Sequence, residues 1–261
     1  MASLVFDHEG KLYGTTSVGG GATACAYGCG TVFRLSPASS GSWTETILYS
    51  FGNQVGSGVN PITSLVFDKR GNLYGTASGG AASNGVVFEL SPPVSGPPWK
   101  ETVLYTFQGS TDGSIPSGVI FDEAGNLYGT SYFGGVYGAG TVFELTRNSD
   151  GSWTRAALYS FSSANGDGGY PLAGLVFDAV GNLYGTTHSG GLTVNGGNGT
   201  VFELLPQSGG GWREKILDRF NGYQDGGVPY GGVILDAAGN VFGTTNQGGA
   251  GAAGVVFEVT P

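Results

Sequence analysis

The sequence predicts an all-β protein, and three observations lead to this prediction. A repeat of roughly 54 to 61 residues recurs five times along the chain. Each copy holds short apolar runs of strand length separated by glycine-rich turns. No run of useful length shows the 3.6-residue apolar period of a helix. A repeat of this length with four short strands is typical of a propeller blade, so we expect a five-bladed β-propeller of four-stranded antiparallel blades.

The first three strands of each repeat, A, B and C, follow one pattern. Strand A reads Leu-Val-Phe-Asp, strand B reads Leu-Tyr-Gly-Thr-Thr, and strand C reads Gly-Thr-Val-Phe-Glu-Leu, each with small variations. Turns led by the last residue of strand A join A to B, and glycine-rich loops join B to C. The A strands end at Asp7, Asp68, Asp122, Asp178 and Asp236, and the C strands carry Val-Phe at 32–33, 87–88, 142–143, 201–202 and 256–257.

A fourth strand, D, begins at a tryptophan and runs into Leu-Tyr-Ser-Phe or a relative of it. It is expected at Trp43, Trp99, Trp153 and Trp212, whereas the fifth repeat stops before reaching one. The last blade should therefore have three strands and an outer edge at 255–259. We expect one propeller domain over 1–261, with repeats at about 3–51, 61–107, 116–161, 171–220 and 229–261.

Composition narrows the classes of function. The formal net charge of −9 argues against nucleic acid or an anionic membrane surface as a partner, since both select basic patches. No apolar stretch approaches transmembrane length. Met1-Ala2-Ser3 runs straight into strand A without a secretory signal, so we expect a cytoplasmic protein or, in preference, the trimmed form of an exported one.

Cys25 and Cys29 are the only two cysteines. They lie in the B–C loop of the first repeat, and the sequence leaves open whether they form a small disulfide, which would fit an oxidising compartment. Zinc is disfavoured, because two thiols without a nearby histidine do not fill a tetrahedral site.

The repeated string resembles a known family. Gly-Asn-Leu-Tyr-Gly-Thr-Thr, a Gly-Gly loop, Gly-Thr-Val-Phe-Glu-Leu and a Trp-led strand ending in Leu-Tyr-Ser-Phe are similar to the GloVer tandem repeat of exported bacterial proteins with varied surface anchors. The resemblance covers essentially the whole chain. It implies an exported propeller, and some proteins with such repeats resemble calcium-dependent hydrolases of acyl-homoserine lactones. The sequence departs from the pattern because it has no anchor segment and its last repeat is short.

Propeller topology places the B–C loops and D–A connections on one face. Asp112, Asp167 and Asp225 stand in the D–A connections, each shortly before strand A, with Ser57 at the matching place in the second repeat. Almost all basic residues, Arg155 among them, are expected on the opposite face or at the start of D strands. Three carboxylates with few cations nearby could bind Ca²⁺, which takes oxygen ligands. The alternative is ordinary turn chemistry, in which each aspartate bonds its own backbone.

The same loops carry the other candidate residues. His188 is the only histidine expected on this face and is a candidate base or ligand, although a loop histidine is more often simply exposed. We expect aromatic and amide side chains there to bind a sugar ring or an acyl chain, or else to pack between loops. These candidate substrate-binding residues are Tyr132, Phe133, Tyr137, Tyr170, Tyr230 and Asn246.

Two classes of function follow. The first is a Ca²⁺-assisted hydrolase of a lactone or ester, with the aspartates as metal ligands and His188 as base. The second is a non-catalytic exported module that binds carbohydrate. No Gly-x-Ser-x-Gly elbow or metalloprotease motif is present.

For the open outer edge of the last blade, at 255–259, we expect either a weak homodimer or a monomer in which Glu258 and Pro261 blunt the edge.

Overall fold

The fold is known from a computed structural model. It describes residues 3–39, 41–80, 84–94, 99–191 and 197–261, so the sequence-based expectations for residues 1–2, 40, 81–83, 95–98 and 192–196 lie outside it. Contacts divide the chain into two compact units. One comprises Met1–Gln108 with Asn148–Trp153, and the other comprises Gly109–Arg147 with Thr154–Pro261. That the whole chain forms one domain stays a prediction.

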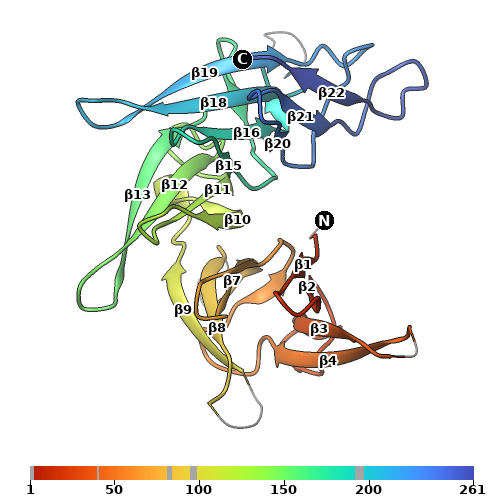
Figure 1. Cartoon of the computed structure of the whole chain (residues 1–261). Helices are drawn as coiled ribbons and strands as arrows, with labels where there is room; N and C mark the ends of the chain where they lie inside the picture. The colour runs from red at the N-terminus through yellow and green to blue at the C-terminus, as the bar shows by residue number, and fades with distance from the viewer. Residues whose placement is uncertain (1–2, 40, 81–83, 95–98, 192–196) are drawn as a thin grey trace. The chain divides into compact units, whose positions relative to one another are not determined.

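Every regular element among the described residues is a β-strand, except for a 3-10 turn at Ser110–Asp112. None of the described residues forms a helix that could cross a bilayer. The strands form one antiparallel sheet for each repeat (Figure 1), and we number these sheets blades 1 to 5 in chain order. The all-β, five-bladed propeller predicted from the sequence is confirmed.

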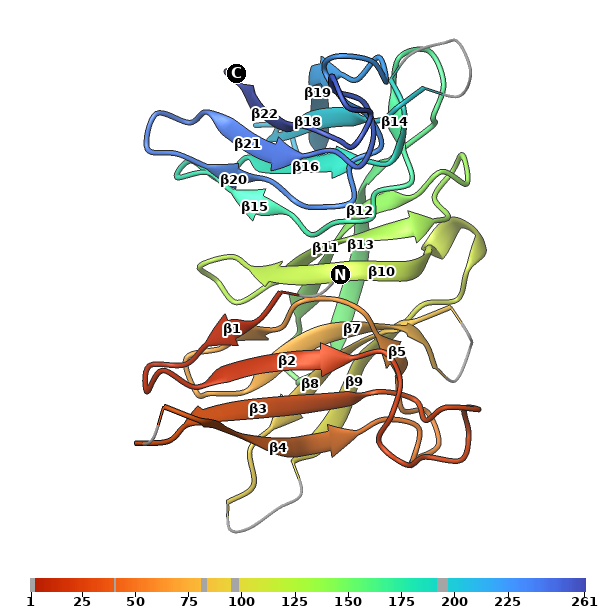
Figure 2. The same cartoon turned by 90° about the vertical axis from the view of Figure 1, so that its right-hand side faces the viewer.

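In blades 1 to 3 the strands pair in the order A, B, C, D, as Figure 2 shows for blade 1. Blade 1 contains β1 (Val5–Phe6), β2 (Leu12–Thr16), β3 (Thr31–Pro37) and β4 (Trp43–Ser50). Blade 2 contains β5 (Val59–Pro61) and β6 (Val66–Phe67), which together form its A strand, then β7 (Leu73–Gly79), β8 (Val86–Ser91) and β9 (Lys100–Thr106). Blade 3 contains β10 (Ser114–Phe121), β11 (Leu127–Phe133), β12 (Thr141–Arg147) and β13 (Trp153–Ser160).

Blade 4 follows the same strand order, whereas the sheet of blade 5 ends with its C strand among the described residues. Blade 4 contains β15 (Val176–Phe177), β16 (Leu183–Thr187), β18 (Thr200–Pro206) and β19 (Trp212–Arg219), and a short ladder of β14 (Gly168–Gly169) with β17 (Ser189–Gly190) precedes it. Blade 5 contains β20 (Ile234–Leu235), β21 (Val241–Thr244) and β22 (Val256–Val259). Among the described residues its sheet has three strands, in the order β20, β21, β22, as expected for the fifth repeat.

The glycine of each Leu-Tyr-Gly-Thr strand is required by the strand beside it. A Cβ on Gly185 would lie 2.6 Å from Phe202 Cζ, and one on Gly75 would lie 2.8 Å from Phe88 Cζ. Both phenylalanines are fully buried. The ring of the C strand therefore lies over the glycine of the B strand, and a side chain there would displace it.

The A–B turns are closed by the aspartate that ends each A strand. In blade 4, Asp178 Oδ1 accepts the N–H groups of Val180 and Asn182 at 2.9 and 2.8 Å. Its Oδ2 accepts the Asn182 side-chain amide at 2.9 Å and the Tyr184 hydroxyl at 3.3 Å. These side-chain bonds hold the turn together with the backbone bond from the Asp178 N–H to the Asn182 carbonyl at 3.0 Å, which indicates a structural role for the aspartate.

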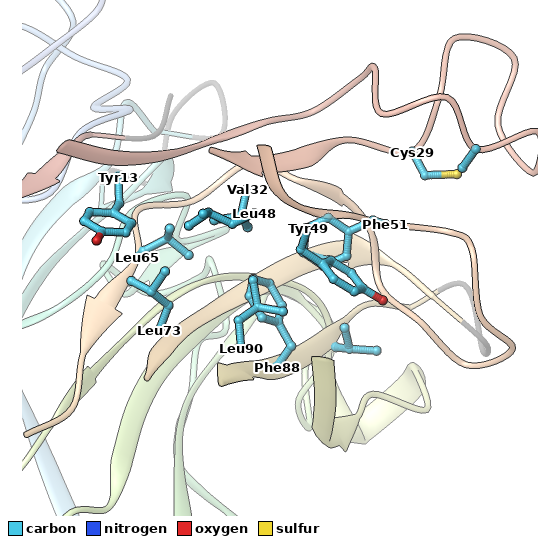
Figure 3. Close-up of a cluster of buried hydrophobic side chains, with 13 residues drawn as sticks. Tyr13, Cys29, Val32, Leu48, Tyr49, Phe51, Leu65, Leu73, Phe88 and Leu90 are labelled. Carbon is cyan, nitrogen blue, oxygen red and sulfur yellow. The ribbon is translucent and has the colours of Figure 1, made fainter. Parts of the chain in front are cut away.

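Neighbouring blades within each unit share two kinds of contact. The phenylalanine that follows a D strand packs edge-on against the C-strand phenylalanine of the next blade, with ring centroids 5.0 Å apart for Phe51 and Phe88 and 5.2 Å apart for Phe161 and Phe202. In blades 1, 3 and 4 a threonine of the B strand also donates to a carbonyl of the next A segment, as Thr186 does to Gly231 at 3.0 Å. These contacts form the core between blades; Figure 3 shows the cluster between blades 1 and 2.

Cys25 and Cys29 form a disulfide across the first B–C loop. Cys29 is fully buried, and its carbonyl accepts the N–H of Asn60 from blade 2 at 2.8 Å. Of the two alternatives left open by the sequence, the structure therefore shows the disulfide and not free thiols. A disulfide of this kind gives a loose indication of an oxidising, exported setting.

Reducing this disulfide is expected to lower the free energy of unfolding by about 2 kcal/mol, since it closes a loop of only a few residues. Urea unfolding with and without dithiothreitol measures the difference. Cys25→Ser should show the same loss and no further response to the reductant. A wild-type curve that does not move with reductant would contradict a stabilising role for the bond.

Candidate functional site

The B–C loops and D–A connections meet at an x-Pro step that lies at or shortly before the A strand in repeats 2 to 5. The residue before the proline donates its N–H to the start of the previous C strand, at 2.7 Å both for Tyr170 to Ala139 and for Val228 to Asn198. Its carbonyl accepts the N–H of the residue that follows its own B strand, at 3.2 Å for His188 to Tyr170 and for Asn246 to Val228. The two kinds of connection therefore lie together, as the sequence analysis expects.

The residue at this step adopts a left-handed backbone conformation in each of four repeats. The φ angles are 54° for Asn60, 55° for Ile115, 58° for Tyr170 and 55° for Val228. This region is unfavourable for side chains with a Cβ and most unfavourable for the β-branched isoleucine and valine. Strain of this kind persists only where surrounding contacts hold it, and at Tyr170 and Val228 the two hydrogen bonds of the step do so.

The structure brings together five of the predicted site residues, Tyr132, Phe133, Tyr170, His188 and Tyr230, which we call the aromatic cluster. The Tyr132 ring lies 4.5 Å from Phe133, 5.4 Å from Tyr170 and 6.3 Å from His188, measured between centroids. His188 lies 5.3 Å from Tyr230. These distances are within the range of edge-to-face aromatic contact. Three successive repeats thus contribute to one cluster.

The aromatic cluster has a buried side and an open side. Tyr132, Tyr170 and His188 are half-buried. Phe133 and Tyr230 are 42% and 51% exposed, so each presents part of a ring to solvent. An aromatic surface with a fixed buried backing is the kind of surface on which a flat or ring-shaped ligand can stack.

Burial also sets the charge of the aromatic cluster. It lowers the pKa of His188, so the imidazole is neutral at pH 7. It raises the pKa of Tyr132, with smaller contributions from Tyr170 and Tyr230, so this hydroxyl stays protonated. His188 Nδ1 lies 2.9 Å from Ser189 Oγ, which holds the ring in place. Ser189 was not predicted from the sequence, and the only feature that could have indicated it is its place next to His188.

Two predicted residues lie apart from the described ring contacts. Tyr137 is 66% exposed, further along the B–C loop of blade 3. Asn246 follows strand β21 at the repeat position that Tyr132 and His188 occupy in blades 3 and 4, and it is exposed. Its backbone N–H bonds to Val228, which leaves its side-chain amide facing outward as a polar group near the x-Pro step.

The three aspartates predicted as calcium ligands are each engaged locally. Asp167 Oδ2 accepts from the Ser162 N–H at 2.6 Å and from its hydroxyl at 2.7 Å, and Asp225 accepts the Asn221 N–H at 3.1 Å. No group of three or more His, Cys, Asp or Glu side chains suited to a metal occurs among the residues with described positions. Calcium binding by these aspartates therefore stays a prediction without an assembled ligand set.

Asp112 also has a cation beside it. Arg155 Nη1 lies 3.5 Å from Asp112 Oδ1, and both side chains are largely buried. The expectation that Arg155 lies away from the aspartates is wrong, because it is the third residue of its D strand and its long side chain reaches inward to the D–A connection. The sequence feature that could have predicted this contact is the spacing of Arg155 from Trp153. The same spacing separates Glu101 from Trp99 and Glu214 from Trp212.

Glu101 and Glu214 occupy the same place in blades 2 and 4. Glu101 accepts the Tyr49 hydroxyl at 2.7 Å and the Gly58 N–H at 3.0 Å, next to Ser57. Glu214 accepts the Tyr159 hydroxyl at 2.8 Å.

Glu214 Oε1 and Asp167 Oδ1 are buried, and neither has a hydrogen-bond partner among the described residues. Burial, and next the Asp167 carboxylate, raise the pKa of Glu214 to about 8. Glu214 therefore keeps its proton at neutral pH.

Comparison with solved structures shows the fold. A luciferin-regenerating enzyme is 14% identical, with a TM-score of 0.55 over 100% of this chain and 91% of its own. A protein of unknown function from Dyadobacter fermentans is 12% identical, with a TM-score of 0.50 over 98% of this chain and 74% of its own. A putative gluconolactonase is 14% identical, with a TM-score of 0.49 over 95% of this chain and 78% of its own.

Sequence comparison shows the family. A search of curated proteins finds no match. The family described as the Gloeobacter/Verrucomicrobia repeat matches residues 97–261, which is more than half of the chain and spans the described repeats of blades 3 to 5. The family resemblance drawn from the repeated strings is confirmed. The chain therefore belongs to the Gloeobacter/Verrucomicrobia repeat family.

Proposed function

We propose that the aromatic cluster binds a small, uncharged ring compound, either a sugar or a lactone. The observation that carries this proposal is the convergence of four aromatic rings and His188 from three repeats, with Phe133 and Tyr230 partly open to solvent. Aromatic faces stack on the C–H face of a saturated ring, and the tyrosine hydroxyls and Asn246 supply hydrogen bonds that orient it. The net charge of −9 favours an uncharged ligand over an anion.

Replacing Tyr230 with Ala is expected to weaken ligand binding roughly fivefold, the effect of losing one stacking ring. Titration calorimetry with methyl β-D-glucopyranoside and with N-butanoyl-homoserine lactone measures this. Tyr223→Ala is the matched control, because Tyr223 is also an exposed tyrosine, at 78%, in the connection between blades 4 and 5, and it makes no described ring contact. Failure of both compounds to bind, or an equal loss in Tyr223→Ala, would exclude the aromatic cluster as their site.

Hydrolysis of a bound lactone or ester is the second candidate, and the neutral His188 favours it. In the tautomer whose Nδ1 proton is donated to Ser189 Oγ, Nε2 is left to accept a proton from a water that attacks the ligand carbonyl. The calcium-dependent form of this reaction has no assembled ligands among the described residues, so this route uses His188 and water. Turnover of N-butanoyl-homoserine lactone with and without EDTA distinguishes the two forms. His188→Ala should keep lactone binding and lose the rate.

A further inference from the structure

A pocket that is separate from the aromatic cluster borders the connection from blade 1 to blade 2. It has a volume of about 360 Å³ and belongs entirely to the first unit of the chain. We call it the β4 pocket, and its lining comprises residues 47–50 at the end of β4, Asn53, Gln54 and Trp99. A cavity of this size is within the range that small-molecule ligands occupy.

One part of the β4 pocket is apolar. Ile47 is 48% exposed although it lies in a strand, and Trp99 is half-buried. Trp99 packs against the core between blades 1 and 2, to which Leu48 and Tyr49 belong (Figure 3). This contact holds the indole from one side. An aromatic ring held in this way is a surface on which the C–H face of a saturated ring can stack.

The other part of the β4 pocket is polar and uncharged. Asn53 and Gln54 are exposed, and the Asn53 amide donates to the Ser50 carbonyl at 3.1 Å. The Asn53 side-chain oxygen and the Gln54 amide make no hydrogen bond among the described residues. An amide both donates and accepts, which matches the hydroxyl groups of a sugar. None of the described lining residues is charged.

The backbone of this connection does not require the two amides. The connection from blade 3 to blade 4 has the same length, and Ser163 and Ala164 stand there in place of Asn53 and Gln54. The Ala164 carbonyl accepts a backbone N–H at 3.0 Å, and the Gln54 carbonyl accepts the matching N–H at 3.2 Å. The same turn therefore forms with small side chains, which leaves the amides of blade 1 available to a ligand.

We propose that the β4 pocket binds one ring of a neutral saccharide, which stacks on Trp99 and hydrogen-bonds to Asn53 and Gln54. The indole calls for an apolar ring face and the amides for several hydroxyl groups, and a sugar ring offers both. An acidic sugar is disfavoured, because the described lining residues supply no cation and the chain has a net charge of −9. The proposal goes beyond the aromatic cluster and does not depend on it.

Saturation-transfer difference NMR with methyl β-D-glucopyranoside and methyl α-D-mannopyranoside tests this inference. The Tyr230→Ala chain is used, so that the aromatic cluster contributes little, and saturable binding of at least one glycoside is expected. Adding Asn53→Ser and Gln54→Ala recreates the side chains of the blade 3 connection. This change should weaken binding roughly tenfold, since it removes two hydrogen-bonding groups. Gln207→Ala is the matched control, because Gln207 is also an exposed glutamine, in the turn between β18 and β19.

Two further comparisons test the stacking and the polar contacts. Trp99→Ala should lose the binding, whereas Trp99→Phe should keep most of it, because phenylalanine retains a ring at this place in the core. Cyclohexanol has a saturated ring with a single hydroxyl group, and methyl β-D-glucuronide carries a carboxylate. Both should bind at least fivefold more weakly than the better glycoside.

The outcomes separate this pocket from the aromatic cluster. Binding that persists in the Tyr230→Ala chain and falls with the two amide substitutions supports the β4 pocket, even if the aromatic cluster binds neither glycoside. Binding to the wild-type chain that Tyr230→Ala abolishes would overturn the inference. So would absence of saturable binding of both glycosides, an equal loss in Gln207→Ala, or equally tight binding of cyclohexanol.

Discussion

Replacing Glu214 with Gln is expected to raise the free energy of unfolding at pH 8 by roughly 2 kcal/mol. The reason is the buried contact with Asp167, where burial and the neighbouring carboxylate raise the Glu214 pKa from 4.5 to about 8. The native state must lose this proton and hold two facing negative charges as the pH rises. A glutamine keeps the Tyr159 hydrogen bond and offers an amide donor to Asp167 without that cost.

The sign of the pH dependence follows from where the proton is bound. Between pH 4.5 and about 8 the native state keeps a proton on Glu214 that the unfolded chain has released. The native state binds more protons in this window, so wild-type stability should fall as the pH rises through it. Below pH 4.5 both states are protonated and this contribution is constant. Urea unfolding at pH 5, 6.5 and 8 measures the slope, which Glu214→Gln should reduce.

Glu101→Gln is the matched control for this substitution. Glu101 holds the same repeat position and the same kind of tyrosine bond, but it faces Ser57 and the Gly58 N–H instead of a carboxylate. Removing its charge weakens two hydrogen bonds, so the variant should be less stable by about 1 kcal/mol at all three pH values. An increase in stability in both variants, or in neither, would show that Asp167 and Glu214 do not interact as described.

Replacing Asp178 with Ala is expected to lower the free energy of unfolding by roughly 3 kcal/mol, whereas Asp236→Ala should cost about 1 kcal/mol. Asp178 accepts four hydrogen bonds in a part-buried turn, one of them from Tyr184. Asp236 accepts three in an exposed turn, because phenylalanine stands where Tyr184 does in blade 4. Chemical denaturation of both variants measures the difference.

Tyr184→Phe isolates the contribution of the hydroxyl to this turn. It removes the bond to Asp178 together with the 2.9 Å bond to Glu203, and it recreates in blade 4 the residue found in blade 5. In the Tyr184→Phe background, Asp178→Ala should cost less than in the wild type, since one of its bonds is already lost. Equal costs in the two backgrounds would mean that the tyrosine adds nothing to the turn.

The strands were predictable because each repeat states the same pattern, and a pattern present in five copies outweighs the ambiguity of any one short run. The left-handed backbone before the proline of repeats 2 to 5 was not predictable, because asparagine, isoleucine, tyrosine and valine all occupy the position. At Asn60, Tyr170 and Val228 a hydrogen bond to the previous blade accompanies it, and such a contact between strands of different repeats has no local sequence signature.

The aromatic part of the candidate site could be predicted from the sequence better than the acidic part. Tyr132 and His188 share one repeat position, so their proximity to Tyr170 and Tyr230 follows once the loops are assigned to one face. The surroundings of Asp112 and Asp167 depend on the third residue of a D strand, more than forty residues further on. Arg155 and Glu214 stand there, and only the packing of strands from distant parts of the chain shows which side chain each aspartate meets.

The residue in the D–A connection and the third residue of the D strand differ from blade to blade. This difference affects how near-identical repeats assemble in the right order. Ser57 lies with Glu101, Asp112 with Arg155, and Asp167 with Glu214. If the D strand of blade 3 docked against the Ser57 connection, Arg155 would be buried without a carboxylate, and a buried charge without its partner is costly. The side chains between blades thus disfavour this exchange, and recombination that put the Ser57 connection in place of the Asp112 connection would be tolerated only if Arg155 changed with it.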